Sequence, residues 1–157
     1  FCFPSCHFVD SFLKIEKMTI TRQEFRYWKT IEVRWGDMDA QGHVNNTVYF
    51  TYCESARVEL LRLIGFKGKQ AGLTEGPTLV HASCDFKRQV VYPAKLDVGI
   101  RVDRIGQRSF KMVYGIFFHG TDEVSAVAVS INAWANYAEG RSVELPEGIR
   151  AALAEYQ

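Results

Sequence analysis

One long segment of helical periodicity, followed by several runs of strand periodicity, constrains this fold more than any other feature of the sequence. Apolar residues recur at helical spacing from Tyr49 to Ile64, and Gly65 is placed to end the helix. Asn45 or Asn46 can cap its start, because an Asn side chain accepts from the free N–H groups of the first turn. Other apolar residues of the segment lie off the main stripe, so we expect other elements to cover the helix on much of its circumference.

Strand-like alternation surrounds this helix on both sides. The predicted strands cover residues 27–35, 80–87, 96–103, 110–118 and 124–134. Trp35 is assigned to the apolar face of the first strand, and the last run is apolar on both faces, which is typical of a central strand. The short gaps at Tyr92-Pro93, Gly106 and Gly120 favour hairpins and hence an antiparallel meander.

These elements predict an α+β fold in which one curved antiparallel sheet of about five strands wraps a long central helix. Pro146 opens a short C-terminal helix. A curved sheet with an open edge or face normally associates with another copy, so we expect an oligomer.

Composition and charge exclude several classes of protein. The chain has 157 residues, of which 47% are hydrophobic and 24% charged, as expected for one globular domain. Its 19 basic and 18 acidic residues give a net charge of +1, which does not support nucleic acid as a partner. No apolar run reaches the roughly 20 residues of a membrane helix, so no membrane partner is expected.

The chain is predicted to consist of an N-terminal extension at 1–17 and one domain at 18–157, because Met18 is a natural start for the domain. Cys2, Cys6 and His7 offer too few ligands for a zinc site, so no metal or other cofactor is expected. Cys53 and Cys84 fall in apolar periodic segments and are interpreted as buried side chains. This cysteine usage fits the reducing cytoplasm.

The segment between the first strand and the helix carries the residues for chemistry. Asp39 lies four residues before His43, and Asn45 and Asn46 follow directly at the helix start. The first-turn N–H groups of a helix have no intrahelical partner and can donate to a developing oxyanion. A carboxylate beside them can attack a thioester carbonyl or remove a proton from an attacking water. The alternative is that Asp39 and Asn45 only cap and brace the loop.

The stretch from Val33 to Asn46, together with Tyr49, Glu54 and Arg57, resembles the 4-hydroxybenzoyl-CoA thioesterase family of hotdog-fold proteins. The resemblance covers the chain from about residue 18 to its end. It implies the hotdog fold, dimers and often tetramers, and hydrolysis of an acyl-CoA. It also implies that Asp39 is the catalytic carboxylate and that the backbone N–H near Asn46 is the oxyanion donor.

The plant acyl-ACP thioesterases share a similar motif at Asp39, His43 and the residues that follow it. Gln41 stands where that group has Asn, and those enzymes usually contain two hotdog repeats. An acyl-ACP substrate therefore remains an alternative to acyl-CoA. A module that binds acyl-CoA without turnover is a third hypothesis.

Further residues are predicted to bind the substrate or assist catalysis. His43 either polarises the carbonyl and steadies Asp39 or hydrogen-bonds a loop carbonyl. Lys87 and Arg88 lie at the end of a predicted strand and can bind the phosphates of CoA, as can the arginines around Gly106. Asn45 and Tyr49 complete the predicted substrate-binding set. Glu54 lies three residues before Arg57, a spacing that predicts an intrahelical ion pair.

Overall fold

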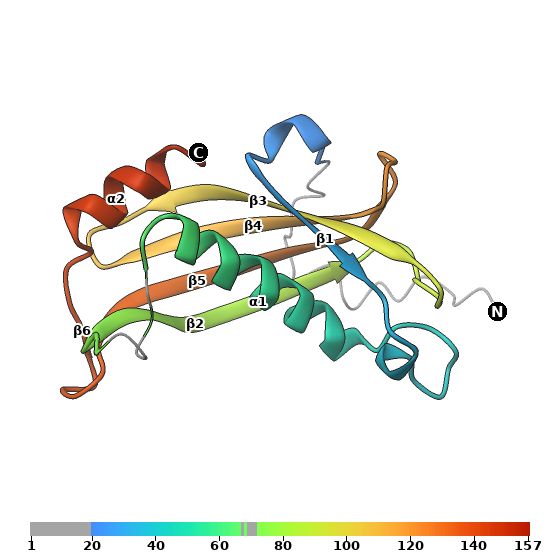
Figure 1. Cartoon of the computed structure of the whole chain (residues 1–157), viewed down its shortest axis with the longest axis horizontal. Helices are drawn as coiled ribbons and strands as arrows, with labels where there is room; N and C mark the ends of the chain where they lie inside the picture. Colours follow the sequence, from blue (N-terminus) through green and yellow to red (C-terminus); the bar gives the residue numbers. More distant parts are fainter. Residues whose placement is uncertain (1–19, 67, 69–71) are drawn as a thin grey trace, which may run out of the picture.

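The computed structural model describes residues 20–66, 68 and 72–157 (Figure 1). The predicted extension at 1–17, with the cysteines and histidine considered for zinc, lies outside the described residues.

A curved antiparallel sheet holds one long helix against its concave face (Figure 1), which confirms the predicted architecture. The strands are β1 (Tyr27–Glu32), β2 (Glu75–Phe86), β3 (Lys95–Ile105), β4 (Ser109–Phe118), β5 (Val124–Asn136) and the short β6 (Arg141–Ser142). The helices are α1 (Asn46–Leu63) and α2 (Glu147–Ala154), with 3-10 turns η1 (Arg22–Glu24) and η2 (Trp35–Asp37).

The main core lies between α1 and the concave face of the sheet. Helix α1 contributes buried residues at helical spacing to this core, among them Tyr52, Ala56 and Leu60, and Leu60 is fully buried. Alternate residues of the central strands face this stripe, among them Ile100 and Met112. Each large apolar side chain buried in this way contributes about 1.5–3 kcal/mol to folding, so the helix is held mainly by packing.

The strand order is β1-β3-β4-β5-β2, which corrects the predicted meander. Strands β3, β4 and β5 do form successive hairpins, but β2 pairs with β5 along its whole length and not with β3. The connection at 87–94 is therefore a crossover instead of a hairpin. It is held across the end of the sheet because Val90 is fully buried and its carbonyl accepts from the N–H of Val44 at 2.8 Å.

The first strand ends three residues earlier than predicted. Strand β1 stops at Glu32, and Trp35 lies in η2 with 75% of its surface exposed instead of on a buried face. The chain turns here because the Asp37 carboxylate accepts from the backbone N–H of Arg34 at 2.9 Å, which fixes a tight turn in place of extended backbone.

A second hydrophobic cluster covers the convex face of the sheet. It joins the residues that flank η1 to β4 and β5, and Phe25, Val113 and Phe117 are among its buried members. Gly99 and Gly115 lie opposite each other in β3 and β4, and a Cβ on Gly115 would fall 2.5 Å from the ring of Phe25. The two glycines thus make room for aromatic rings against the sheet.

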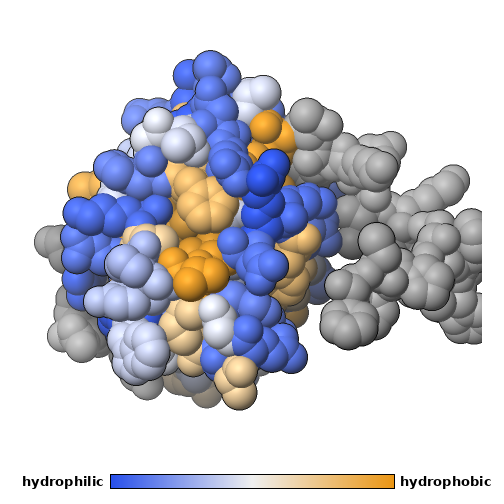
Figure 2. All heavy atoms as spheres, turned by 90° about the vertical axis from the view of Figure 1, so that its right-hand side faces the viewer, coloured by the Kyte–Doolittle hydropathy of each residue, from blue (hydrophilic) through white to orange (hydrophobic). Residues whose placement is uncertain are grey.

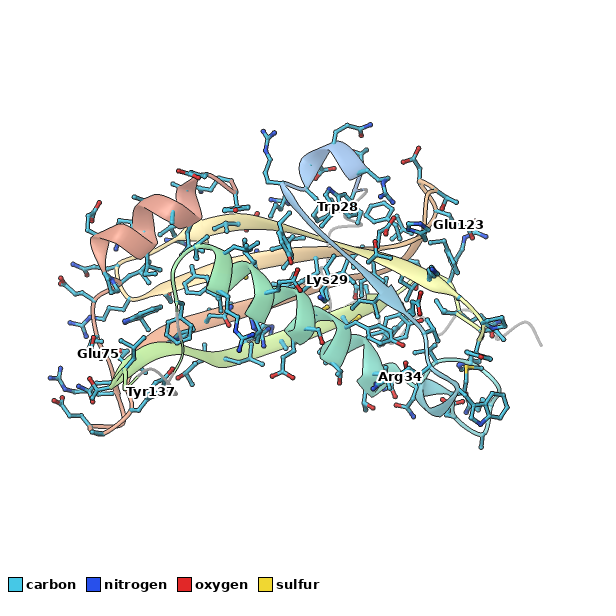
Figure 3. All side chains as sticks on the ribbon, in the orientation of Figure 1. Trp28, Lys29, Arg34, Glu75, Glu123 and Tyr137 are labelled. Carbon is cyan, nitrogen blue, oxygen red and sulfur yellow. The ribbon has the colours of Figure 1, made fainter. Side chains whose placement is uncertain are left out.

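Figure 3 shows how side chains are distributed along the molecule. Arg34 and Glu123 lie at the end of the sheet where α1 begins, whereas Glu75 and Tyr137 lie at the opposite end. Within the described part of the chain, no helix combines the length and the apolar character needed to cross a bilayer.

Candidate active site

The loop between β1 and α1 folds back on itself and presents Asp39. A bridge between Met38 and Val44 closes its base, and the N–H of Asp39 donates to the carbonyl of His43 at 3.0 Å. The tip is a tight turn in which the N–H of Gly42 donates to the carbonyl of Asp39 at 3.1 Å, and Gly42 adopts a φ of +82°, a conformation that favours glycine. The Asp39 Oδ1 atom accepts from the N–H of Gln41 at 2.8 Å.

Asp37 anchors this loop to the helix. Its side chain is buried and accepts from the guanidinium of Arg34 at 2.8 and 3.0 Å and from the hydroxyl of Tyr52 at 2.7 Å. Burial raises the pKa of Asp37, but the hydrogen bonds from Arg34 and Tyr52 have a larger opposite effect, so its pKa lies below the usual range. Asp37 is therefore a buried carboxylate whose bonds hold the loop and leave it no free face for chemistry.

The start of α1 presents the backbone N–H of Asn46. The side chain of Asn45 caps the helix, as predicted, by accepting from the N–H of Thr47 at 2.9 Å, and the N–H of Val48 donates to the carbonyl of Asn45 at 3.0 Å. Among the described residues, the N–H of Asn46 forms no hydrogen bond. The positive end of the helix dipole is also at this point.

A cavity of about 490 Å³ opens between this loop, the start of α1 and the end of β2. It is lined by Asp39, Gln41, His43, Val44, Asn45, Asn46, Tyr49, Phe86, Lys87, Arg88 and Gln89. The fold therefore brings the predicted residues of the loop and the helix start together with Lys87 and Arg88, although the end of β2 and the helix start are some 40 positions apart in the chain. Figure 2 views this end of the molecule, where apolar residues gather at the centre and hydrophilic residues surround them.

Tyr49 forms the inner wall of the cavity. It is 3% exposed, its ring lies edge-on to that of Phe86 with centroids 5.1 Å apart, and its hydroxyl accepts from Ser125 Oγ at 3.5 Å. Burial raises the pKa of Tyr49, so its phenol is neutral at physiological pH. Tyr49 thus gives the cavity an apolar side without adding charge.

The two cations at the mouth of the cavity differ in their surroundings. Arg88 forms an ion pair with Glu123 at 3.0 Å, whereas Lys87 lies 4.0 Å from the Asp85 carboxylate. The arginines around Gly106 do not line this cavity, because the turn at Gly106 joins β3 to β4 at the other end of these strands. Arg101, for example, pairs with Asp103 at 2.9 Å.

Other predictions for side chains near the site had mixed outcomes. Cys53 is buried, as predicted, but Cys84 is only partly buried; both are free thiols, and burial raises the pKa of Cys84 to about 12. The predicted ion pair between Glu54 and Arg57 does not form, because Arg57 turns into the interior and donates to the hydroxyl of Tyr114 at 3.3 Å.

Sequence reasoning missed the anchoring role of Asp37. Its spacing of three residues from Arg34 is a sign of a capped turn, but the contact with Tyr52 depends on tertiary structure. In the described ranges, no group of three or more His, Cys, Asp or Glu side chains is arranged to hold a metal ion.

Comparison with known proteins places these observations in a family. Residues 33–153 match the Thioesterase-like superfamily. The crystal structure of the PA5185 protein from Pseudomonas aeruginosa strain PAO1 superposes with a TM-score of 0.82 and 30% identity, covering 87% of this chain and 95% of that one.

Two thioesterases share the fold at lower identity. The 1,4-dihydroxy-2-naphthoyl-CoA thioesterase from Synechocystis has a TM-score of 0.75 and 20% identity, over 82% of this chain and 96% of that one. The DHNA-CoA thioesterase from Staphylococcus aureus has a TM-score of 0.75 and 18% identity, over 82% of this chain and 89% of that one. The match is to the superfamily and does not single out the 4-hydroxybenzoyl-CoA branch. The chain is thus a hotdog-fold protein that belongs to the Thioesterase-like superfamily.

Proposed function

We propose that this protein is an acyl-CoA thioesterase that hydrolyses an acyl-CoA to a free acid and CoA. The observation that carries the proposal is that the Asp39 carboxylate and the unpaired N–H of Asn46 line one cavity. A carboxylate can activate the nucleophile, and a helix-start N–H can hold the oxyanion. Membership of the Thioesterase-like superfamily supports the same reaction class.

In the proposed reaction the thioester carbonyl oxygen accepts from the N–H of Asn46. Asp39 either removes a proton from a water that adds to the carbonyl carbon or attacks that carbon itself, forming an anhydride that water then hydrolyses. Oδ1 of Asp39 is held by Gln41, so Oδ2 is the atom assigned to either role. In the first route the adduct with water then expels the thiolate; in the second the C–S bond breaks as the anhydride forms, before water hydrolyses it. In both routes the thiolate leaves readily because an alkyl thiol has a pKa of about 8.5, and it takes up the proton released by the water. His43 lines the same cavity and is assigned to steady the carbonyl or Asp39.

The remaining residues of the cavity are assigned to the CoA moiety. Lys87 is the cation with the weaker internal partner, so we assign it, together with Arg88, to the phosphates of CoA. Asn45 and Tyr49 are assigned to the pantetheine and thioester region, because they lie beside the helix start.

A homo-oligomer is part of this proposal. Strand β2 is an edge of the sheet and carries exposed apolar side chains, with Leu79 47% and Val80 60% exposed. An open apolar edge of this kind favours pairing with a second copy, which gives a dimer and, by further association, a tetramer. We assign the protein to the cytoplasm, since Cys53 and Cys84 are free thiols.

The test is thiol release from aliphatic and aromatic acyl-CoAs by the wild type, by Asp39→Asn and by Asp122→Asn. The last variant makes the same chemical change in the exposed β4–β5 turn. We expect Asp39→Asn to lose about 10²–10³ or more in kcat, with an unchanged circular dichroism spectrum, and the control to retain full turnover. Equal turnover of wild type and Asp39→Asn would refute the role of Asp39.

The carrier is tested in the same assay by offering each acyl group on ACP as well. Hydrolysis confined to acyl-ACP would replace the proposed substrate. No hydrolysis of either substrate, with acyl-CoA still bound, would identify a binding module.

A further inference from the structure

Arg57 is a buried cation without a buried anion. It is only 8% exposed, and its guanidinium donates to the hydroxyl of Tyr114 at 3.3 Å. That hydroxyl lies 2.8 Å from Ser130 Oγ, which in turn accepts from Asn132 at 3.0 Å. Burial raises the pKa of Tyr114, so the phenol stays neutral. Every partner of Arg57 in this network is therefore uncharged.

No carboxylate of the described residues forms an ion pair with Arg57. Glu54, three residues earlier on α1, is exposed and makes no such pair. A buried guanidinium has five N–H donors and is costly to leave without a counter-charge. The arrangement around Arg57 thus lacks one anionic partner.

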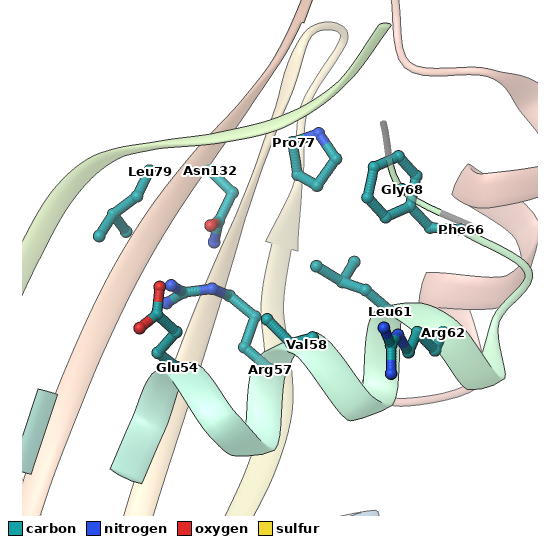
Figure 4. Close-up of a pocket in the computed structure, with 10 residues that line it drawn as sticks. All are labelled: Glu54, Arg57, Val58, Leu61, Arg62, Phe66, Gly68, Pro77, Leu79 and Asn132. Atoms are coloured by element: carbon teal, nitrogen blue, oxygen red, sulfur yellow. The ribbon is translucent and has the colours of Figure 1, made fainter. Parts of the chain in front are cut away.

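The guanidinium borders a cavity that could hold such a partner. This cavity, of about 430 Å³, lies between α1 and the strands β2 and β5, and Arg57, Leu61, Phe66, Pro77 and Asn132 are among its lining residues. Figure 4 shows Arg57 running back along α1 toward Glu54, with its guanidinium on the side of Asn132. The charged lining residues are two arginines, Arg57 and Arg62, and one glutamate, Glu54, which leaves one net positive charge.

A smaller cavity of about 150 Å³ continues this space toward the start of α1. It shares Glu54, Arg57 and Leu79 with the larger cavity and adds Phe50 and Cys53. Asn46 and Arg57 are eleven residues apart, which is roughly 16 Å along a helix, and a helical side chain leans toward the N-terminus. A medium acyl chain whose thioester lies at the helix start is therefore long enough to reach Arg57.

We propose that this cavity holds the far end of the acyl group and that Arg57 binds a carboxylate there. The preferred substrates would then be the mono-CoA thioesters of medium-chain dicarboxylic acids. Arg and carboxylate can pair through two parallel hydrogen bonds, which selects strongly for that group over a methyl end. This inference rests on the proposed thioesterase function for the reaction, but binding at Arg57 can be measured without turnover.

The first experiment compares kcat/KM for adipoyl-, suberoyl- and sebacoyl-CoA with hexanoyl-, octanoyl- and decanoyl-CoA. We expect the wild type to favour a dicarboxylic substrate over its matched partner on the order of 10–100-fold. Arg57→Met should abolish the preference, Arg57→Lys should restore part of it, and Arg62→Met should keep it. Arg62 is the matched control because it is an exposed arginine on the same cavity.

A second substitution, at an exposed position, tests the cavity even if the substitutions of the buried Arg57 cause misfolding. Val58 is 44% exposed and lines the larger cavity, so Val58→Trp should fill the space without touching the fold of the core. We expect it to lose activity on the longer substrates of both series while short acyl-CoAs are still hydrolysed. Unchanged chain-length preference in Val58→Trp would overturn the assignment of this cavity.

Binding of free suberate, measured by isothermal titration calorimetry, separates the two proposals. Suberate should bind the wild type and Arg62→Met but not Arg57→Met. Suberate binding without any acyl-CoA hydrolysis would refute the proposed function and support the cavity. Hydrolysis with neither dicarboxylate preference nor suberate binding would refute the role of Arg57. Dissociation of an oligomer by Arg57→Met, with selectivity unchanged, would assign the missing anion to a second copy and also overturn the proposal.

Discussion

The hydrogen bond from Tyr52 to Asp37 should contribute strongly to stability, and Tyr52→Phe tests this. Tyr52 is 3% exposed, and its hydroxyl donates to a buried carboxylate at 2.7 Å. Phe fills the same space, so the substitution removes the bond without opening a cavity. A hydrogen bond to a charged group contributes about 1.5–3 kcal/mol, and we expect the free energy of unfolding at pH 7 to fall by that amount.

The pH dependence of this loss follows from the pKa of Asp37. That pKa is lowered in the folded protein, so the bonds of Asp37 stabilise the fold above the ordinary Asp pKa of about 3.9. This stabilisation is lost as the pH falls through the folded pKa. When the Tyr52 hydroxyl is absent, the pKa of Asp37 in the folded protein should rise. The difference between variant and wild type should therefore be largest at neutral pH and shrink in acid, as the pH falls through the folded pKa of Asp37.

The assay is urea denaturation followed by circular dichroism at several pH values, with Tyr92→Phe as the control. Tyr92 is 43% exposed, and its hydroxyl has no hydrogen-bond partner among the described residues. A loss for Tyr52→Phe that is no larger than that of the control would refute the reasoning. A loss that stays the same through the acid titration of Asp37 would show that the carboxylate charge is not involved.

Further substitutions test other parts of the structure. Asn45→Ala removes the helix cap and should lower the free energy of unfolding, measured by denaturation, by about 0.5–2 kcal/mol. Asn46→Ala keeps its backbone N–H and should retain turnover, measured by thiol release. Gly115→Ala should destabilise by about 1–3 kcal/mol, because its Cβ would meet the Phe25 ring at 2.5 Å; Gly36→Ala, with nothing within 4 Å, is the denaturation control. Lys87→Met should raise KM for an acyl-CoA on the order of tenfold but leave KM unchanged for an N-acetylcysteamine thioester, which lacks phosphates; equal effects on both would remove Lys87 from phosphate binding.

Local signals in the sequence predicted α1 and its surroundings well. The change from alternation to helical period is a local property, and so is the capping preference of Asn45. The cavity around Asp39 was predictable to the same extent, because most of its residues lie within the motif or directly after β2.

Features that depend on distant partners were not predictable in this way. The position of β2 beside β5 is set by a register over residues some 40 to 60 positions apart, and nothing in the alternation of β2 encodes it. Trp35 continues the alternation of apolar and polar residues in β1, but the chain turns before it because Asp37 accepts a hydrogen bond from the backbone N–H of Arg34. The spacing of Glu54 and Arg57 predicts an ion pair, whereas Arg57 contacts Tyr114, which lies 57 positions away in the chain and cannot be found from local spacing.

The crossover at 87–94 determines when the site can exist during folding. Helix α1 and the β3–β4–β5 hairpins rely on short-range contacts, which form early and fast. The wall of the cavity that carries Lys87 and Arg88 is fixed only when their N–H groups reach the carbonyl of Ser125, at 2.8 and 3.0 Å. That contact requires β2 to close on β5, so its loop-closure entropy must be overcome first. Regain of activity on refolding should therefore follow the slowest phase, and a compact intermediate would contain the helix and the hairpins but no substrate cavity.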